Sequence, residues 1–142
     1  MSPPRRILIV DDSTAMRLLL AHAVGRLPDV VVDQAENGLA ALQALKATPA
    51  SPYDLVLLDI NMPVLDGMKL LGMMQADPAF AATTLCVVTT EESPEAEAQA
   101  RALGARYFLR KPVSRRSVEL VLAEVFGLPR PPEPGVAGGD GR

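Results

Sequence analysis

Five short aliphatic runs, separated by amphipathic stretches, constrain the fold of this chain more than any other feature. Each run is three or four residues long and does not alternate with polar residues. Continuous apolar runs of this length are typical of strands buried on both faces, as in a parallel sheet. The runs are Ile7–Val10, Val30–Val32, Leu55–Leu58, Leu85–Val88 and Tyr107–Leu109.

Between and after these runs, apolar residues recur at three- and four-residue steps, which predicts a helix after each strand. The helical patterns fall within 16–27, 39–45, 68–74, 98–102 and 118–126. In the first two, Leu19 and Leu39 are expected on the buried face.

Serine and glycine residues mark the ends of these helices. The expected N-caps are Ser13 or Thr14, Ser93 with Pro94, and Ser114, and the expected stops are Gly104 and Gly127. Five repeats of strand then helix with right-handed crossovers predict an α/β fold, with helices on both faces of a parallel sheet.

Composition and length narrow the function classes. The net charge of −3 argues against a nucleic-acid partner. The single cysteine, Cys86, cannot form an internal disulfide, which suits a reducing cytoplasm. The apolar run after Arg5-Arg6 is too short for an export signal, and no stretch approaches a membrane span.

The chain divides at residue 127. Residues 1–127 carry the strand–helix repeats, whereas residues 128–142 hold four prolines and four glycines. Such a segment has few apolar residues to bury, so we expect one domain followed by a disordered tail.

Polar residues follow four of the five predicted strands. Asp11 and Asp12 follow the first, Asp59 the third, Thr89 the fourth and Lys111 the fifth. In an open α/β sheet, sites form beyond the carboxyl ends of the strands. Three acids brought together repel one another unless a cation is bound, and oxygen ligands alone favour Mg²⁺ or Mn²⁺.

These residues carry a resemblance to response-regulator receiver domains. Ile9-Val10-Asp11-Asp12-Ser13 resembles the acidic pair of the family, and Leu57–Pro63 with Asp66-Gly67 is similar to its phosphoacceptor region. Val87-Val88-Thr89 and Lys111-Pro112 complete the set over residues 5–126. Because no output domain follows, the chain looks most like the stand-alone, CheY-like members.

The resemblance implies a fold and a site. The fold is the flavodoxin-like, doubly wound five-stranded sheet of order 2-1-3-4-5 with five helices. Asp59 would be the phosphoacceptor, and Asp12, Asp59 and the Asn61 carbonyl would bind Mg²⁺, for which Mn²⁺ can substitute. Asp11 would act through a metal-bound water. Lys111 and the Thr89 hydroxyl would contact phosphoryl oxygens.

The resemblance also implies partners. A histidine kinase or phosphotransfer protein would donate the phosphoryl group, and Thr89 with Phe108 would switch a readout face on helix four, strand five and helix five. Many relatives carry Tyr where this chain has Phe108, and adjacent Tyr107 is expected on the opposite face of the strand. Thr90 is bulkier than usual and is expected to narrow the space for the switch aromatic.

Further expectations concern lifetime and output. Asn61 and Glu91 would position an attacking water and give a short-lived phosphoryl state. The chain would thus be a signalling domain with self-catalysed phosphoryl transfer and autodephosphorylation, and chemotaxis is one compatible setting. The acids around helix four are expected to form a solvated face or to select a basic partner; they are Glu91, Glu92, Glu95 and Glu97.

Four other functions remain to be weighed. An aspartyl hydrolase needs a second acid two residues after the nucleophile, where this chain has Asn61. A docking module that does not need phosphorylation would be indicated by the loss of Asp12, Asp59 or Lys111, and all three are present. A transcription regulator would need a DNA-binding domain, and a flavin-binding relative would need aromatic residues placed around a ring system.

Overall fold

The chain forms one five-stranded parallel sheet flanked by helices. The computed structural model describes residues 4–47, 52–60, 62, 65–90 and 93–132. The strands are β1 (Arg5–Val10), β2 (Val30–Ala35), β3 (Leu55–Leu58), β4 (Thr84–Thr89) and β5 (Ala105–Arg110). The helices are α1 (Thr14–Val24), α2 (Gly38–Ala47), α3 (Gly67–Ala76), α4 (Pro94–Ala102) and α5 (Arg115–Phe126), with a 3-10 turn at Pro78–Phe80.

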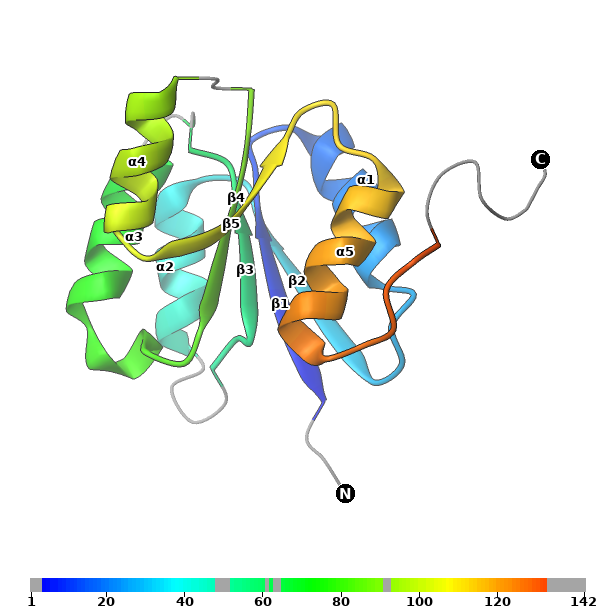
Figure 1. Ribbon diagram of the computed structural model, residues 1–142. Helices are drawn as coiled ribbons and strands as arrows, with labels where there is room; N and C mark the ends of the chain where they lie inside the picture. Colours follow the sequence, from blue (N-terminus) through cyan, green and yellow to red (C-terminus); the bar gives the residue numbers. More distant parts are fainter. Residues whose placement is uncertain (1–3, 48–51, 61, 63–64, 91–92, 133–142) are drawn as a thin grey trace.

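The predicted topology is confirmed. The strand order is β2-β1-β3-β4-β5, and every pairing is parallel. In Figure 1, α2, α3 and α4 cover one face of the sheet, and α1 and α5 cover the other. This is the flavodoxin-like arrangement, in which ligands bind beyond the carboxyl ends of the strands, at the upper edge in Figure 1.

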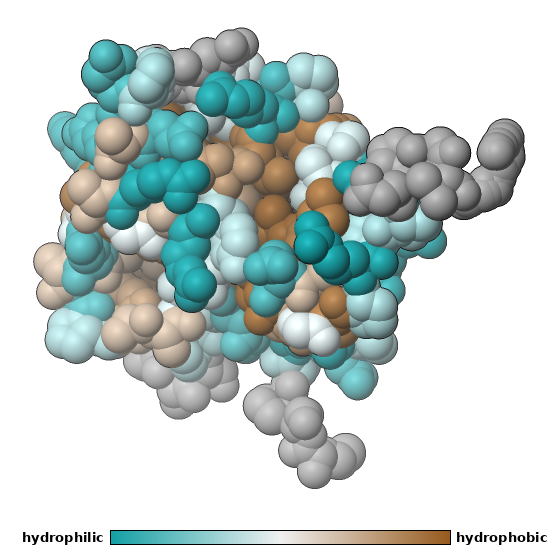
Figure 2. Space-filling view, viewed as in Figure 1, coloured by the Kyte–Doolittle hydropathy of each residue, from teal (hydrophilic) through white to brown (hydrophobic). Residues whose placement is uncertain are grey.

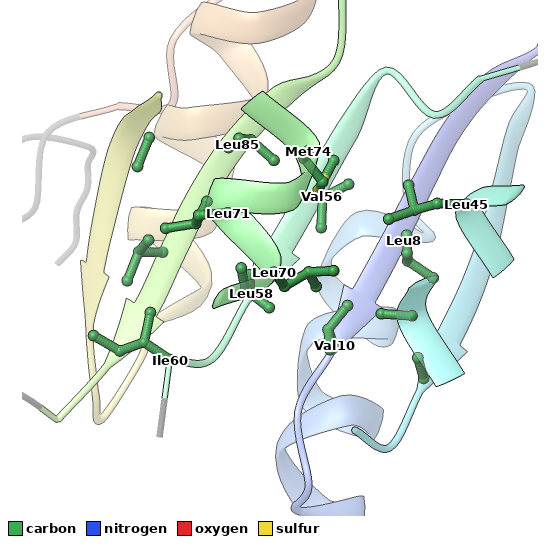
Figure 3. Packing of buried hydrophobic residues seen from close by; sticks show 14 of the residues in the cluster. Leu8, Val10, Leu45, Val56, Leu58, Ile60, Leu70, Leu71, Met74 and Leu85 are labelled. Atoms are coloured by element: carbon green, nitrogen blue, oxygen red, sulfur yellow. The ribbon is translucent and has the colours of Figure 1, made fainter. Parts of the chain in front are cut away.

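Each face of the sheet builds its own apolar core, because successive strand residues point to opposite faces. In β1, Leu8 and Val10 pack with the α2, α3 and α4 side, whereas Ile7 and Ile9 pack with the α1 and α5 side. Figure 3 shows the first cluster, where Leu70, Leu71 and Met74 of α3 approach β3 and β4. The central strands are therefore buried on both faces, as their sequences predict.

Several expectations of burial were wrong. Val30–Val32 of β2 and Tyr107 and Phe108 of β5 are only half-buried, because both strands lie at the edges of the sheet. Leu19 is 43% exposed and Leu39 is 47% exposed, although their spacing placed both on buried faces. In α1 the buried stripe runs through Leu20, Ala23 and Val24, and helical spacing alone does not fix which edge of a wide apolar stripe meets the sheet.

The predicted helix ends are confirmed. Ser13, Ser93 and Ser114 each accept a hydrogen bond from the amide three residues ahead. Gly104 and Gly127 follow α4 and α5 with positive φ, which glycine adopts without steric cost.

The described part of the tail runs back along α5. The Leu128 amide donates to the Ala123 carbonyl at 3.0 Å, and Arg116 Nε donates to the Pro132 carbonyl at 3.1 Å. The division at residue 127 and the disorder of 128–142 stay predictions. Among the described helices, none has the length and apolar character needed to span a membrane.

Two glycines hold the segment after β3 in place by close approach. A Cβ on Gly67 would lie 2.5 Å from Ile60 Cα and 2.7 Å from the Asp59 carbonyl oxygen. A Cβ on Gly38 would lie 2.1 Å from the carbonyl oxygen of Leu65. Neither glycine has a positive φ, so the constraint at both is the absence of a side chain. The start of α3 thus packs directly against the backbone of Asp59 and Ile60, and the start of α2 packs against that of Leu65.

We expect Gly67→Ala to lower the free energy of unfolding by about 1–3 kcal/mol, because the added methyl meets backbone that cannot move aside. Gly72→Ala in the same helix is the matched control, since its Cβ would meet only Leu103 Cδ2 at 4.0 Å. That control should gain up to about 1 kcal/mol from helix propensity. Urea unfolding of both variants measures the difference, and equal stability would contradict the close-approach account.

Candidate functional site

The backbone register delivers Asp11 and Asp59 side by side at the carboxyl edge of the sheet. Val10 of β1 is paired with Leu58 of β3, and each acid is the next residue. The ladder continues past both strand ends, because the Asp59 amide donates to the Val10 carbonyl at 2.9 Å. On the other side of β1, the Asp11 amide donates to the Ala35 carbonyl at 3.1 Å. The backbone of both acids is therefore fixed by the sheet itself.

The three predicted acids lie together. One carboxylate oxygen from each of Asp11, Asp12 and Asp59 lies within 4.8 Å of the others. Asp11 and Asp59 are buried, whereas Asp12 is exposed. The amide of Ser13 donates to Asp11 Oδ1 at 2.9 Å. The cluster is thus anchored inside the domain and open to solvent at Asp12.

Lys111 brings a positive charge to the two buried acids. Its Nζ lies 3.0 Å from Asp11 Oδ2 and 3.4 Å from Asp59 Oδ2. The Lys111 amide donates to the Thr89 carbonyl at 3.0 Å, so the end of β4 sets the position of the lysine backbone. One ammonium group thereby faces carboxylates that follow two different strands.

The pKa of Lys111 is raised by this placement. Burial alone would lower the pKa by penalising the charged form, and burial is the largest single influence. The contacts and charges of Asp11 and Asp59 act in the opposite direction and together outweigh it. Lys111 therefore stays an ammonium group at neutral pH and cannot serve as a base there.

Thr89 and Phe108 line one small hollow beneath α4. Thr89 is buried at the end of β4, and Phe108 is half-buried on neighbouring β5. The hollow is also lined by Ile60, next to the predicted acceptor. Tyr107 packs with the apolar cluster on the α1 and α5 side, so it lies on the opposite face from Phe108, as expected. Thr90 is exposed.

Some predicted residues lie outside the described part of the chain. Asn61, assigned a metal-binding carbonyl and a role in positioning water, is one of them, as are Glu91 and Glu92. Of the other acids around helix four, Glu97 makes ion pairs with Arg101 and Arg110. The charge of Glu97 is therefore partly neutralised by these two arginines.

One supporting residue escaped the sequence reasoning. Arg17 Nη1 donates to the Asp11 carbonyl at 2.7 Å, and its Nη2 donates to Thr14 Oγ1 at 3.2 Å. Arg17 thus ties the first turn of α1 to the loop that carries the acidic pair. Its only sequence signal is a basic residue six positions after Asp11.

The donor set fits a hard divalent cation. All three groups are carboxylates, which suit Mg²⁺ or Mn²⁺ and not a zinc site built on nitrogen and sulfur. Asp11 Oδ2 is buried and has the Lys111 ammonium at 3.0 Å as its charge partner. One ammonium group does not balance three carboxylates, so the cluster still favours a divalent cation.

The family model for the response regulator receiver domain matches residues 7–123. The chain belongs to this family. Receiver domains are signalling domains of two-component systems that histidine kinases or phosphotransfer proteins phosphorylate. They bind Mg²⁺ through an acidic cluster, and this chain carries such a group.

Named relatives and solved structures agree with this placement. A probable chemotaxis protein CheY of Rhizobium etli is 30% identical over 122 residues, covering 86% of this chain and 92% of the relative. The structure of chemotaxis response regulator CheY4 of Vibrio cholerae has a TM-score of 0.77 at 28% identity, covering 86% of this chain and 98% of that chain.

A longer relative matches over part of its length. It is the protein-glutamate methylesterase/protein-glutamine glutaminase of group 2 operon of Rhodospirillum centenum, 37% identical over 129 residues. The match covers 88% of this receiver chain but 31% of the methylesterase. The chain thus spans about a third of the length of that relative.

We expect Lys111→Met to lower the free energy of unfolding by about 1–3 kcal/mol near pH 7, because two buried carboxylates lose their counter-charge. Lys69→Met on α3 is the matched control, since Lys69 is exposed. Thermal unfolding in metal-free buffer compares the two. A loss no larger than that of the control would show that Lys111 does not balance the acids.

Proposed function

We propose that Asp59 accepts a phosphoryl group from a phosphohistidine of a histidine kinase or phosphotransfer protein. The observation that carries this proposal is the position of the Asp59 carboxylate. It lies beside Asp11 and Asp12 and is 3.4 Å from the Lys111 ammonium, which also contacts Asp11. A nucleophilic carboxylate, a cation-binding acid pair and a fixed positive charge therefore meet at one edge of the sheet.

In the proposed step, an Asp59 oxygen attacks the phosphorus in line. The new oxygen–phosphorus bond forms as the nitrogen–phosphorus bond of the donor breaks, and the imidazole nitrogen keeps the bonding electron pair and takes up a proton. Lys111 neutralises charge on the incoming group. The Thr89 hydroxyl donates a hydrogen bond to another phosphoryl oxygen.

Asp12, Asp59 and the carbonyl of Asn61 are the proposed metal ligands, with Asp11 acting through a bound water. When bound, the divalent cation supplies the positive charge that lets a carboxylate approach a phosphoryl group. The exposure of Asp12 supports its role as a direct ligand, because an exposed side chain is free to meet an ion that enters from solvent.

The proposed output is a shift between two conformations. The phosphoryl group draws in Thr89, and Phe108 moves toward the hollow that the two residues share. The group changes the equilibrium only by its differential affinity for the two states. The readout face is α4, β5 and α5, where a downstream protein binds. The CheY-named relative, which the match covers to 92%, supports a chemotaxis setting. The proposed location is the cytoplasm.

The phosphoryl state is proposed to be short-lived, with Asn61 and Glu91 positioning the attacking water, so that the domain dephosphorylates itself.

A second candidate function is that of a docking module that keeps the acidic pocket without using it. The approach of Asp11, Asp12 and Asp59 to within 4.8 Å of one another favours the first function, because three like charges this close destabilise a site that serves only docking.

We expect the intact mass to rise by one phosphoryl group when the chain is incubated with Mg²⁺ and acetyl phosphate or phosphoramidate. Asp59→Asn should show no gain, because an amide is a poor nucleophile. Asp29→Asn is the matched control and should gain the group normally: Asp29 precedes β2 and has φ 53°, a conformation that Asn tolerates.

Omitting Mg²⁺ should abolish the gain in wild type. A gain retained in Asp59→Asn would move the acceptor to another residue. No gain with either donor, from a protein that unfolds cooperatively, would leave two alternatives: a receiver that accepts the group only from its kinase, or the docking module.

A further inference from the structure

The outer face of Phe108 is covered by an arginine from α4. The guanidinium carbon of Arg101 lies 4.4 Å from the centre of the Phe108 ring. Arg101 Nε and Nη2 donate to Glu97 Oε2 at 3.3 and 3.1 Å. The other oxygen of Glu97, Oε1, lies 3.6 Å from Arg110 Nη2. Glu97 therefore orients Arg101 from one helical turn away and also ties α4 to β5.

Phe108 lines the same small hollow as Thr89. Ile60 and Val87 line this hollow from the sheet side, and Glu97 lines it from α4. The ring of Phe108 thus borders a mainly apolar space shared with Thr89 and also contacts a cation from α4. Figure 2 shows hydrophilic side chains over much of α4, the helix that carries Arg101.

We propose that Arg101, oriented by Glu97, is a positioning residue that holds Phe108 in its outer place and so opposes phosphoryl uptake at Asp59. This inference rests on the proposed function, in which Phe108 moves toward Thr89. A guanidinium is attracted to the negative face of an aromatic ring. Movement of the ring into the hollow removes that face from Arg101 and weakens the contact.

The contact between Arg101 and Phe108 is strong enough to shift the equilibrium between the two conformations but too weak to prevent the change. The side chains of Arg101 and Glu97 are 54% and 36% exposed, so solvent screens their ion pair and it contributes little by itself. An exposed cation–π contact corresponds to about a two- to fivefold change in an equilibrium constant. Phosphorylation can overcome such a bias. Removing the contact between Arg101 and Phe108 should nevertheless change the affinity by a measurable amount.

The chain provides its own matched control. Arg106 lies over the ring of the next aromatic, Tyr107, at 5.9 Å. Tyr107 packs on the opposite face of the sheet from Phe108. Arg106→Ala therefore removes an arginine–aromatic contact of the same kind without touching the ring of Phe108, which shares the hollow with Thr89.

The test measures the affinity of the full chain for beryllofluoride, a stable stand-in for a phosphoryl group on a carboxylate, in the presence of Mg²⁺. Arg101→Ala should bind about two- to fivefold more tightly than wild type, and Arg106→Ala should match wild type. Glu97→Gln should shift in the direction of Arg101→Ala. Thermal unfolding of each variant shows whether a change in affinity reflects the switch or only altered stability.

A double-mutant cycle isolates the ring. In a Phe108→Leu background, Arg101→Ala should no longer change the affinity, because leucine offers no aromatic face. Equal affinities for wild type and Arg101→Ala, or weaker binding by Arg101→Ala, would overturn the role of Arg101 and leave the acceptor site standing. Absence of Mg²⁺-dependent binding in wild type would instead overturn the proposed function, and this inference with it.

Discussion

Repulsion among three carboxylates is the constraint around which the rest of the site is organised. Asp11, Asp12 and Asp59 bring oxygens within 4.8 Å of one another, and two of the three acids are buried. Like charges this close destabilise a fold unless positive charge is supplied. Lys111 supplies part of it from inside, at 3.0 and 3.4 Å from the buried pair. The negative charge that Lys111 does not balance favours the binding of a divalent cation beside Asp59.

A repulsive cluster needs a rigid frame, and the parallel sheet provides it. Pairing of Val10 with Leu58 and the hydrogen bond from the Asp59 amide set the two buried acids side by side. Gly67 and Gly38 allow the starts of α3 and α2 to approach the segment after β3 closely. The strand interiors bury aliphatic side chains on both faces, so the apolar core holds the charged edge in place.

Much of the fold and the location of the site followed from the sequence, because both depend on local patterns. Apolar runs located the strands, serine and glycine located helix ends, and residues after strand ends must meet at one edge of a parallel sheet. The exposure of Leu19 and Leu39 could not be predicted from the sequence, since it depends on how each helix is rotated about its own axis against the sheet. The contact of Arg101 with Phe108 also did not follow, because it joins α4 to β5 through side-chain geometry. Glu97 belonged to an expected acidic face, yet it pairs with two arginines that lie near it only in the fold.

The most direct test of charge repulsion and cation binding at the acidic cluster is the midpoint of thermal unfolding with increasing Mg²⁺, for wild type and Asp12→Asn. Without Mg²⁺, Asp12→Asn should be the more stable protein, because one like charge is removed from an exposed position. Mg²⁺ should raise the midpoint of wild type more than that of Asp12→Asn. For wild type, the free energy of unfolding should increase by about 2.7 kcal/mol when the Mg²⁺ concentration is a hundred times its dissociation constant. An unchanged wild-type midpoint across Mg²⁺ concentrations, or a less stable Asp12→Asn in metal-free buffer, would contradict the account.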